Sequence, residues 1–171
     1  MTTKLRHAAT AGLFLALACG ADRAAALQAG AQRPAAKPVD MCALLTQEEA
    51  AAILGAAVEA PQQVAGGTCT YTPQAGMGDD IMIHMLPLTF GSEEEFHAFL
   101  VEDTDQMNAR IKKDLGDAVK PTTVDPVPEV GKAAYYVDPT LVILKDGRVL
   151  SIVAADRKQA TAVAAKAVAR F

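Results

Sequence analysis

Two neighbouring residues of the sequence carry side chains that could bind a soft metal ion. Met82 and His84 lie two positions apart in the apolar run 81–86, so in a strand their side chains would share one face. A thioether together with an imidazole suits Cu(I), which makes this pair a candidate copper site. Methionines also fill hydrophobic cores, and Met85 would point to the opposite face of the strand. We therefore favour packing over metal binding for this group.

Residues for other kinds of catalysis lack the partners that they need. His7 lies at the N-terminus, and His97 is expected on the surface of a helix. Ser92 precedes a helix and Ser151 lies inside a strand, and neither occupies the G-x-S-x-G turn of a hydrolase nucleophile. The acidic run 103–108 begins like a calcium loop but lacks its third ligand and its glycine. We predict no catalytic residues, no cofactor and no enzymatic activity, with an enzyme built from unpaired carboxylates as the alternative.

The three cysteines predict one disulfide bond. Cys19 follows an N-terminal apolar run, where it would be lipidated or removed, so Cys42 and Cys69 remain as a pair. Outside the cytosol, two such thiols can be oxidised. Zinc binding by this pair is disfavoured, because no second C-x-x-C pair or nearby histidine completes a ligand set. We therefore expect a structural Cys42–Cys69 disulfide.

The first 18 residues have the three parts of a secretory signal peptide. Lys4 and Arg6 give a positive start, and residues 8–18 form an apolar run that is shorter than the roughly 20 residues needed to cross a bilayer. The run ends in A-L-A before Cys19 and resembles the lipobox of bacterial lipoproteins, with Ala16 where that pattern prefers leucine. This predicts export and lipidation at Cys19, which would hold the protein on a membrane surface in the periplasm or cell envelope. The alternative is a soluble secreted form cut at a later small-residue site.

The composition predicts one folded domain behind a tether. Residues 20–38 contain one large apolar side chain, Leu27, and cannot bury enough surface to fold, so we interpret residues 19–39 as a flexible tether. Residues 40–171 suffice for a single domain. The chain is 51% hydrophobic, but 35 of its residues are alanine, and its net charge is −4. Because nucleic-acid-binding proteins usually carry a basic surplus, we expect no nucleic-acid partner.

Three segments have the spacing of amphipathic helices. The capping boxes T-x-x-E at 46–49 and S-x-x-E at 92–95 mark the starts of the first two helices. We expect the first helix at 46–55 and the third between Asp156 and the C-terminus. The second helix is long, and its apolar face comprises Phe96, Phe99, Leu100, Met107 and Ile111.

The remaining segments of the domain predict an antiparallel sheet. Pro87 would end one strand, three prolines make residues 116–129 a loop, and Asp146-Gly147 suits a type I′ hairpin turn. Strands are expected at 64–72, 81–86, 133–137, 140–145 and 148–154. The expected fold class is α+β, with an antiparallel sheet of about five strands, three amphipathic helices packed against it and one disulfide.

Three short motifs together resemble a known family. They are C-A-L-L-T at 42–46, followed by Glu49 and Leu54-Gly55, then G-T-C-T-Y at 67–71 and V-G-K-A-A-Y at 130–135. This order is similar to that of small bacterial secreted lipoproteins of unknown function, first noted in actinobacteria and similar to extracellular sensor domains of their membrane kinases. The resemblance implies an N-terminal lipobox, a bridge between the two motif cysteines and an α+β fold. It implies no assigned activity and no catalytic residues.

The tyrosines supply the candidate binding surface. Tyr71, Tyr135 and Tyr136 all lie in predicted strands, and adjacent strand residues face opposite sides, so Tyr135 or Tyr136 must point towards solvent or a rim. Exposed aromatic side chains often contact ligands or partners. The alternative, which we favour for each single tyrosine, is a half-buried side chain that packs within its strand. We therefore predict an exported, lipid-anchored envelope protein whose non-enzymatic domain binds a small ligand or an envelope protein. A periplasmic copper-handling protein that uses Met82 and His84 is the alternative.

Overall fold

The computed structural model describes residues 39–171, apart from residues 65–66, 75 and 77–78. These residues belong to one compact unit, Pro38–Phe171. The predicted signal peptide, the candidate lipidation residue Cys19 and the tether up to residue 38 lie outside the described residues.

Three α-helices and seven strands form the described part of the chain. The helices are η1 (Met41–Ala43), α1 (Gln47–Leu54), α2 (Glu93–Leu115), η2 (Gly116–Ala118) and α3 (Arg157–Arg170), of which η1 and η2 are short 3-10 helices. The strands are β1 (Gln62–Val64), β2 (Thr68–Tyr71), β3 (Ile81–Thr89), β4 (Asp125–Pro126), β5 (Ala134–Val137), β6 (Thr140–Lys145) and β7 (Arg148–Val153). The predicted class, helices packed on an antiparallel sheet, is confirmed.

The sheet has seven strands in the order β1-β2-β3-β7-β6-β5-β4, and every neighbouring pair is antiparallel. The prediction of about five strands is wrong because both edge strands are very short. β1 lies before the Gly67 turn, and β4 lies within the proline-rich stretch that we predicted as a loop. Pro126 is tolerated in β4 because an edge strand leaves one side without a partner.

Two turns show how local chemistry sets the strand ends. The Asp146-Gly147 hairpin is confirmed, since both residues have the positive φ (51° and 76°) that a type I′ turn requires. The predicted end of β3 at Pro87 is wrong, and the strand continues to Thr89. The register with β7 shifts between Leu86 and Thr89, so Pro87 lies in an irregular stretch where its missing N–H breaks no regular ladder bond.

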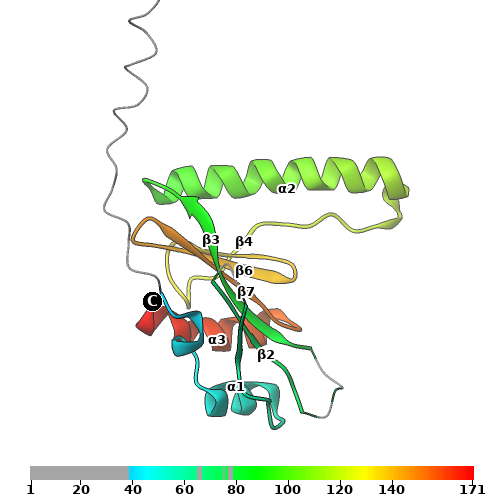
Figure 1. Ribbon diagram of the computed structural model, residues 1–171. Helices are drawn as coiled ribbons and strands as arrows, with labels where there is room; N and C mark the ends of the chain where they lie inside the picture. Colours follow the sequence, from blue (N-terminus) through cyan, green and yellow to red (C-terminus); the bar gives the residue numbers. More distant parts are fainter. Residues whose placement is uncertain (1–38, 65–66, 75, 77–78) are drawn as a thin grey trace, which may run out of the picture. The chain divides into compact units, whose positions relative to one another are not determined.

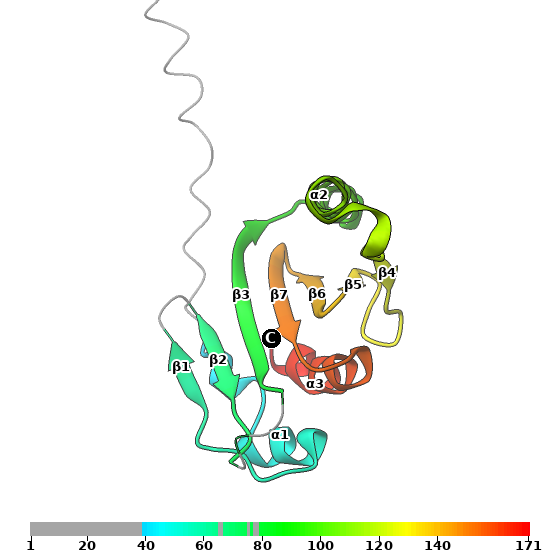
Figure 2. The same ribbon diagram turned by 90° about the vertical axis from the view of Figure 1, so that its right-hand side faces the viewer.

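Helices pack on both faces of the sheet (Figure 1). We call the face covered by α1 and α3 the lower face and the face covered by α2 the upper face; Figure 2 shows them on either side of the curved sheet. The lower core contains fully buried Ile81, Ile83, Leu141, Leu150 and Ile152 together with Ala160, Val163, Ala164 and Ala167 of α3. The upper core is smaller and contains Phe90, Phe96, Leu100, Ala133, Val142 and Val149.

Helix α2 is packed along only part of its length. Its predicted capping box forms only in part: the Ser92 hydroxyl accepts from the Glu95 amide at 3.1 Å, but the Glu95 carboxylate accepts from the amide of Gly91, at 2.8 Å, and not from that of Ser92. Of its predicted apolar face, Phe96 and Leu100 are buried, whereas Phe99 and Met107 are 38% and 37% exposed. The second half of the helix extends past the strands (Figure 1), which explains why Met107 is not covered.

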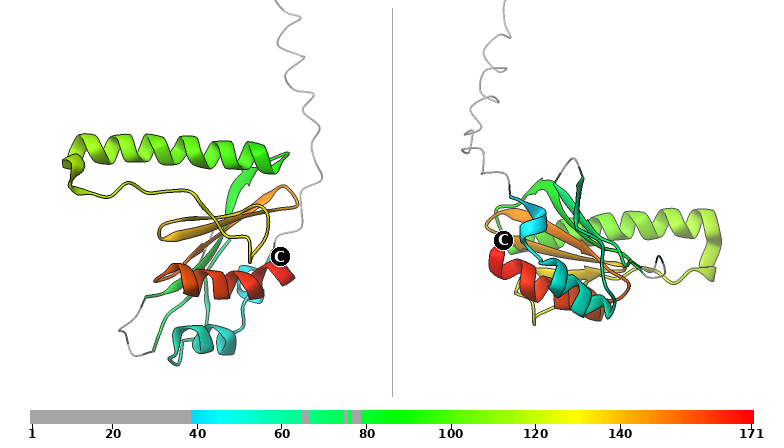
Figure 3. Two further views of the ribbon diagram at one scale, coloured as in Figure 1. Left: turned by 180° about the vertical axis from the view of Figure 1, so that it is seen from behind. Right: turned by 60° about the horizontal axis from the view of Figure 1, so that its bottom comes forward.

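Three contacts fasten the start of the domain to the rest of the fold. Cys42 and Cys69 lie at disulfide distance, with their Cα atoms 5.2 Å apart, which joins η1 to β2. The Tyr71 hydroxyl donates to the carbonyl oxygen of Leu45. The Arg170 guanidinium donates two hydrogen bonds to the carboxylate of Glu49, at 2.6 and 2.8 Å, and Figure 3 shows the end of α3 beside the start of the domain. We call residues 41–49 the N-terminal clasp.

Breaking the disulfide should lower the stability of the domain. The bond closes a loop over a sequence separation of 27 residues, for which the chain-entropy model gives about 3–4 kcal/mol. We expect the Cys42→Ser/Cys69→Ser double variant and the chemically reduced wild type to unfold at similarly lowered urea concentrations. A reductant should leave the double variant unchanged. If the reductant also leaves the wild-type midpoint unchanged, the bond does not support the fold.

The pairing of Glu49 with Arg170 should make stability depend on acid pH. The hydrogen bonds from Arg170, followed by the one from the Thr46 backbone, lower the pKa of Glu49 from 4.5 to about 2. Because the folded-state pKa lies below that of the unfolded chain, this stabilisation is present above pH 4.5 and is lost as the pH falls towards about 2. We expect Glu49→Gln to be less stable than wild type at neutral pH, with a difference that shrinks in acid. Urea unfolding at several pH values across this range measures the difference in stability between the two proteins.

Glu48→Gln is the matched control, because Glu48 is exposed and lies one position away in the same helix. Its stability should follow that of the wild type across the whole pH range. If the stability of Glu49→Gln varied with pH in the same way as that of Glu48→Gln, the contact with Arg170 would not stabilise the fold.

Candidate functional site

The structure separates the three tyrosines of the predicted binding surface. Tyr71 is fully buried, its hydroxyl donates to Leu45 and it lies 3.2 Å from the carbonyl oxygen of Cys42. Burial, and then the charge of Asp40, raises the pKa of Tyr71 to about 12. Tyr71 therefore fastens the N-terminal clasp. Its assignment to a binding surface is wrong, because none of its side chain reaches solvent.

Tyr135 and Tyr136 lie on opposite faces of β5, as the alternation of a strand requires. Tyr135 is half-buried on the upper face, where its ring centroid lies 5.0 Å from that of His97 and 5.9 Å from that of Phe96. Tyr136 belongs to the lower core and is 8% exposed, and its hydroxyl donates to the carboxylate of Asp138 at 3.0 Å. The two rings therefore lie on opposite faces of the sheet and do not share one surface.

A cavity of about 340 Å³ lies beside Tyr136 at the β4 edge of the sheet. The pairing of β4 with β5 consists of Asp125 opposite Tyr136 and Pro126 opposite Tyr135, so residues 120–124 are not paired with β5. We call the space that opens there the edge cavity. Its volume falls within the range of roughly 300–1,000 Å³ that is usual for small-molecule sites. It is lined by Lys120, Pro121, Thr122, Thr123, Asp125, Tyr136 and Asp138.

The lining of the edge cavity offers both hydrogen-bond donors and acceptors. Burial, and then the hydrogen bond to Asp138, raises the pKa of Tyr136, so its hydroxyl is a protonated donor at neutral pH. Asp138 is exposed, and a carboxylate that accepts one hydrogen bond has lone pairs left for others. Asp125 lies 3.9 Å from Arg157, which also donates to the carbonyl oxygen of Pro126 at 2.8 Å. The cavity can therefore hold a small polar molecule with several hydrogen-bonding groups.

A side chain from α2 positions the outer wall of the edge cavity. The Asn108 amide donates to the carbonyl oxygen of Thr122 at 2.8 Å, and its oxygen accepts from the Thr122 amide at 2.9 Å. This pair of bonds satisfies the backbone amide and carbonyl of Thr122, which do not pair with β5. Sequence reasoning missed Asn108, because it belonged to the rejected calcium run and nothing local indicates that a helix residue bonds a loop 14 positions away.

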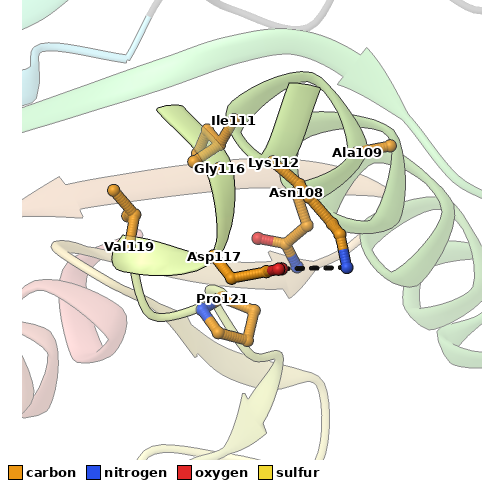
Figure 4. Close-up of a pocket in the computed structure, with 8 residues that line it drawn as sticks. All are labelled: Asn108, Ala109, Ile111, Lys112, Gly116, Asp117, Val119 and Pro121. Atoms are coloured by element: carbon orange, nitrogen blue, oxygen red, sulfur yellow. Dashed lines mark ion pairs between the residues drawn. The ribbon is translucent and has the colours of Figure 1, made fainter. Parts of the chain in front are cut away.

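A second cavity, of about 280 Å³, lies where the chain turns back after α2 (Figure 4). Lys112 and Asp117 reach towards each other there, with nitrogen and oxygen 2.9 Å apart. Their side chains are 72% and 84% exposed, so water screens this ion pair strongly. Every residue that lines this cavity is exposed or half-buried. The edge cavity, which includes the buried Tyr136, is therefore the better candidate site.

The structure also brings Met82 and His84 to one face, as predicted. They lie on the upper face of β3, where Met82 is 37% exposed and His84 is half-buried, whereas Ile81 and Ile83 face the lower core. The Thr68 hydroxyl lies 2.5 Å from Nδ1 of His84 across the β2–β3 pair. This contact fixes the orientation of the imidazole.

The other residues considered for catalysis have capping, packing or surface positions. Ser92 caps α2, Ser151 is buried within β7, and His97 is exposed on α2. Within the described residues, no group of three or more His, Cys, Asp or Glu side chains could hold a metal ion. No helix in this part of the chain has the length and apolar character needed to cross a membrane.

Comparison of the chain with protein-family models, with curated proteins and with solved structures found no match. The edge cavity and the Met82–His84 pair are therefore interpreted from their own chemistry.

Proposed function

We propose that the protein is an exported, lipid-anchored component of the cell envelope whose domain binds a small polar ligand in the edge cavity without transforming it. The edge cavity carries this proposal, because it combines a suitable volume, about 340 Å³, with hydroxyl, ammonium and carboxylate groups on its lining. The proposal also allows a protein partner from the envelope, which would bind over this edge of the sheet.

The cysteine pair supports a location outside the cytosol. Cys42 and Cys69 lie at disulfide distance, and such bonds form and persist in oxidising compartments. The sequence of residues 1–19 adds the signal peptide and the candidate lipid-accepting Cys19. Together they support a location on the outer side of a membrane, which is where the domain would meet the proposed ligand.

The lining favours a molecule that both donates and accepts hydrogen bonds. Carboxylates at Asp125 and Asp138 accept from hydroxyl or amine groups, whereas Lys120 and the threonine hydroxyls donate to ligand oxygens. A compact polyhydroxylated molecule such as a monosaccharide satisfies both requirements. Large apolar ligands would leave these polar groups without partners, which is costly once water is displaced.

One observation favours a second candidate function. Asp125 and Asp138 line the same cavity, and two carboxylates in one cleft are the arrangement that glycoside-hydrolysing enzymes use. Both carboxylates have partners within the protein, however: Arg157 lies 3.9 Å from Asp125, and Tyr136 donates to Asp138 at 3.0 Å. We therefore place binding ahead of hydrolysis, and the experiment below distinguishes the two.

Binding can be tested with the purified protein and a panel of monosaccharides and amino sugars. We expect at least one compound to shift the NMR signals of Thr122, Tyr136 and Asp138, and Asp138→Asn to weaken this binding about tenfold, the order expected for loss of one hydrogen bond to a charged group. Asn108→Ala should weaken it as well, by releasing the cavity wall. Asp117→Asn, which alters the other cavity, is the control and should bind as the wild type does.

The outcomes separate the candidate functions. Binding without turnover supports the proposal, whereas hydrolysis of glycosides that is lost in Asp125→Asn or Asp138→Asn would establish the enzyme instead. Shifts that avoid the edge cavity for every compound, or equal binding by Asp138→Asn and Asp117→Asn, would contradict the assignment of the site.

Export and anchoring can be tested by mass spectrometry of the protein from intact cells. We expect a mature chain that begins at a lipid-modified Cys19 and in which Cys42 and Cys69 cannot be alkylated without prior reduction. Cys19→Ser should release the protein from the membrane fraction. An unprocessed initiator methionine, or two free thiols at positions 42 and 69, would show that the protein is not exported.

A further inference from the structure

The upper face of the sheet is open at the first half of β3. Met82 lies between Thr70 of β2 and Val153 of β7, and His84 lies between Thr68 and Ser151 in the next row. Met82 remains 37% exposed, because the upper core with α2 contains the far half of β3, from Leu86 onward. A soft thioether and an imidazole therefore lie side by side on a surface that water reaches.

A cross-strand contact selects which nitrogen of His84 is available. The Thr68 hydroxyl oxygen lies 2.5 Å from Nδ1, so Nδ1 is engaged. When Nδ1–H donates to this oxygen, Nε2 carries the free lone pair of the neutral ring. A hydrogen bond on the far nitrogen is the usual means by which proteins orient a histidine ligand. Thr68 thus prepares His84 to coordinate through Nε2.

The surroundings favour a soft, singly charged ion over a hard one. The four cross-strand neighbours of Met82 and His84 are two threonines, a valine and a serine, so none of them carries a carboxylate. Hard cations prefer oxygen ligands, and zinc usually takes four donors from histidine, cysteine and carboxylates. No cluster of three such residues occurs in the described part of the chain. Thioether and imidazole donors instead suit Cu(I).

The spacing of the two residues allows both donors to reach one ion. Alternate residues of a strand are about 6.6 Å apart, and both side chains project from the same face. Long, flexible Met82 can bend towards an imidazole that Thr68 holds in place. We propose that Met82 and His84 form a surface site for Cu(I), with Thr68 as the residue that positions the imidazole. This site is separate from the edge cavity, which contains neither residue.

The site can be tested by titrating the protein with Ag(I), which serves as a redox-inert substitute for Cu(I), and then with Cu(I) itself under anaerobic conditions. The chain should carry Cys19→Ser, so that a thiol at that position does not bind the metal. We expect one equivalent to bind, with shifts in the Met82 methyl and His84 imidazole NMR signals. Met82→Leu and His84→Gln should each lower the affinity at least tenfold.

The structure supplies matched controls. Met107 is as exposed as Met82, at 37%, and His97 is an exposed histidine on α2. Met107→Leu and His97→Gln should therefore leave both stoichiometry and affinity unchanged. Thr68→Val retains both ligands but removes the contact to Nδ1, and we expect it to lower the affinity by about tenfold while the unfolding midpoint shows that the fold is intact.

Several results would overturn the proposal. They are the absence of stoichiometric uptake, binding that survives both Met82→Leu and His84→Gln, and equal losses in the Met107 and His97 controls. Zn(II) is a further comparison, because the two-donor site should not retain it in competition with a weak chelator. Zinc binding as tight as that of Cu(I) would show that the site is not selective for soft ions.

Discussion

The attachment of residues 41–49 to the sheet is the constraint on which the lower half of the fold depends. α1 has eight residues, fewer than an isolated helix needs to be stable in water. It persists because Tyr71 and the Cys42–Cys69 pair fix the segment before it, while Glu49 is held by Arg170 at the other end of the chain. Each contact uses a different interaction, namely a buried hydrogen bond, a covalent link and a bidentate ion pair. The N-terminal clasp therefore joins the first, middle and last parts of the domain.

The distribution of the helices over the two faces explains why part of the upper face is open. A sheet of seven strands is roughly 29 Å wide at the usual strand spacing, whereas one helix is about 10 Å across. The lower face receives α1, α3 and η1, but the upper face receives α2 alone, and only Phe96, Leu100 and Thr104 of that helix are buried. One helix cannot cover such a width. Polar and adaptable side chains, among them Thr68, Met82 and His84, occupy the strands that it leaves open.

The elements that could be predicted from the sequence are those whose signals are local. The Thr46–Glu49 capping box, the Ser92 cap and the Asp146-Gly147 turn each depend on residues within a few positions, and each occurs as expected. The two cysteines could be paired by elimination. The Met82–His84 face followed from the alternation of a strand, and the structure confirms this shared orientation.

The features that sequence reasoning missed depend on contacts between distant residues. No local pattern shows that Tyr71 is buried, because the segment that buries it lies 26 positions earlier. Asn108 and Thr122 are 14 positions apart, so no periodic pattern reports their bonds. β1 and β4 are too short to show alternation, and their pairing is defined by the strands that they join. The edge cavity was not predicted for the same reason, because it arises where one of these pairings stops.

The short edge strands have a consequence for both stability and binding. A long exposed edge would offer unpaired backbone groups to other chains and promote aggregation. β4 limits this edge to two residues, one of which is Pro126, and the backbone of Thr122 bonds to Asn108 instead of to β5. The separation that protects the edge also opens the space beside Tyr136 and Asp138. The early end of β4 thus has two consequences. The edge resists further pairing, and the cavity to which we assign the ligand opens beside it.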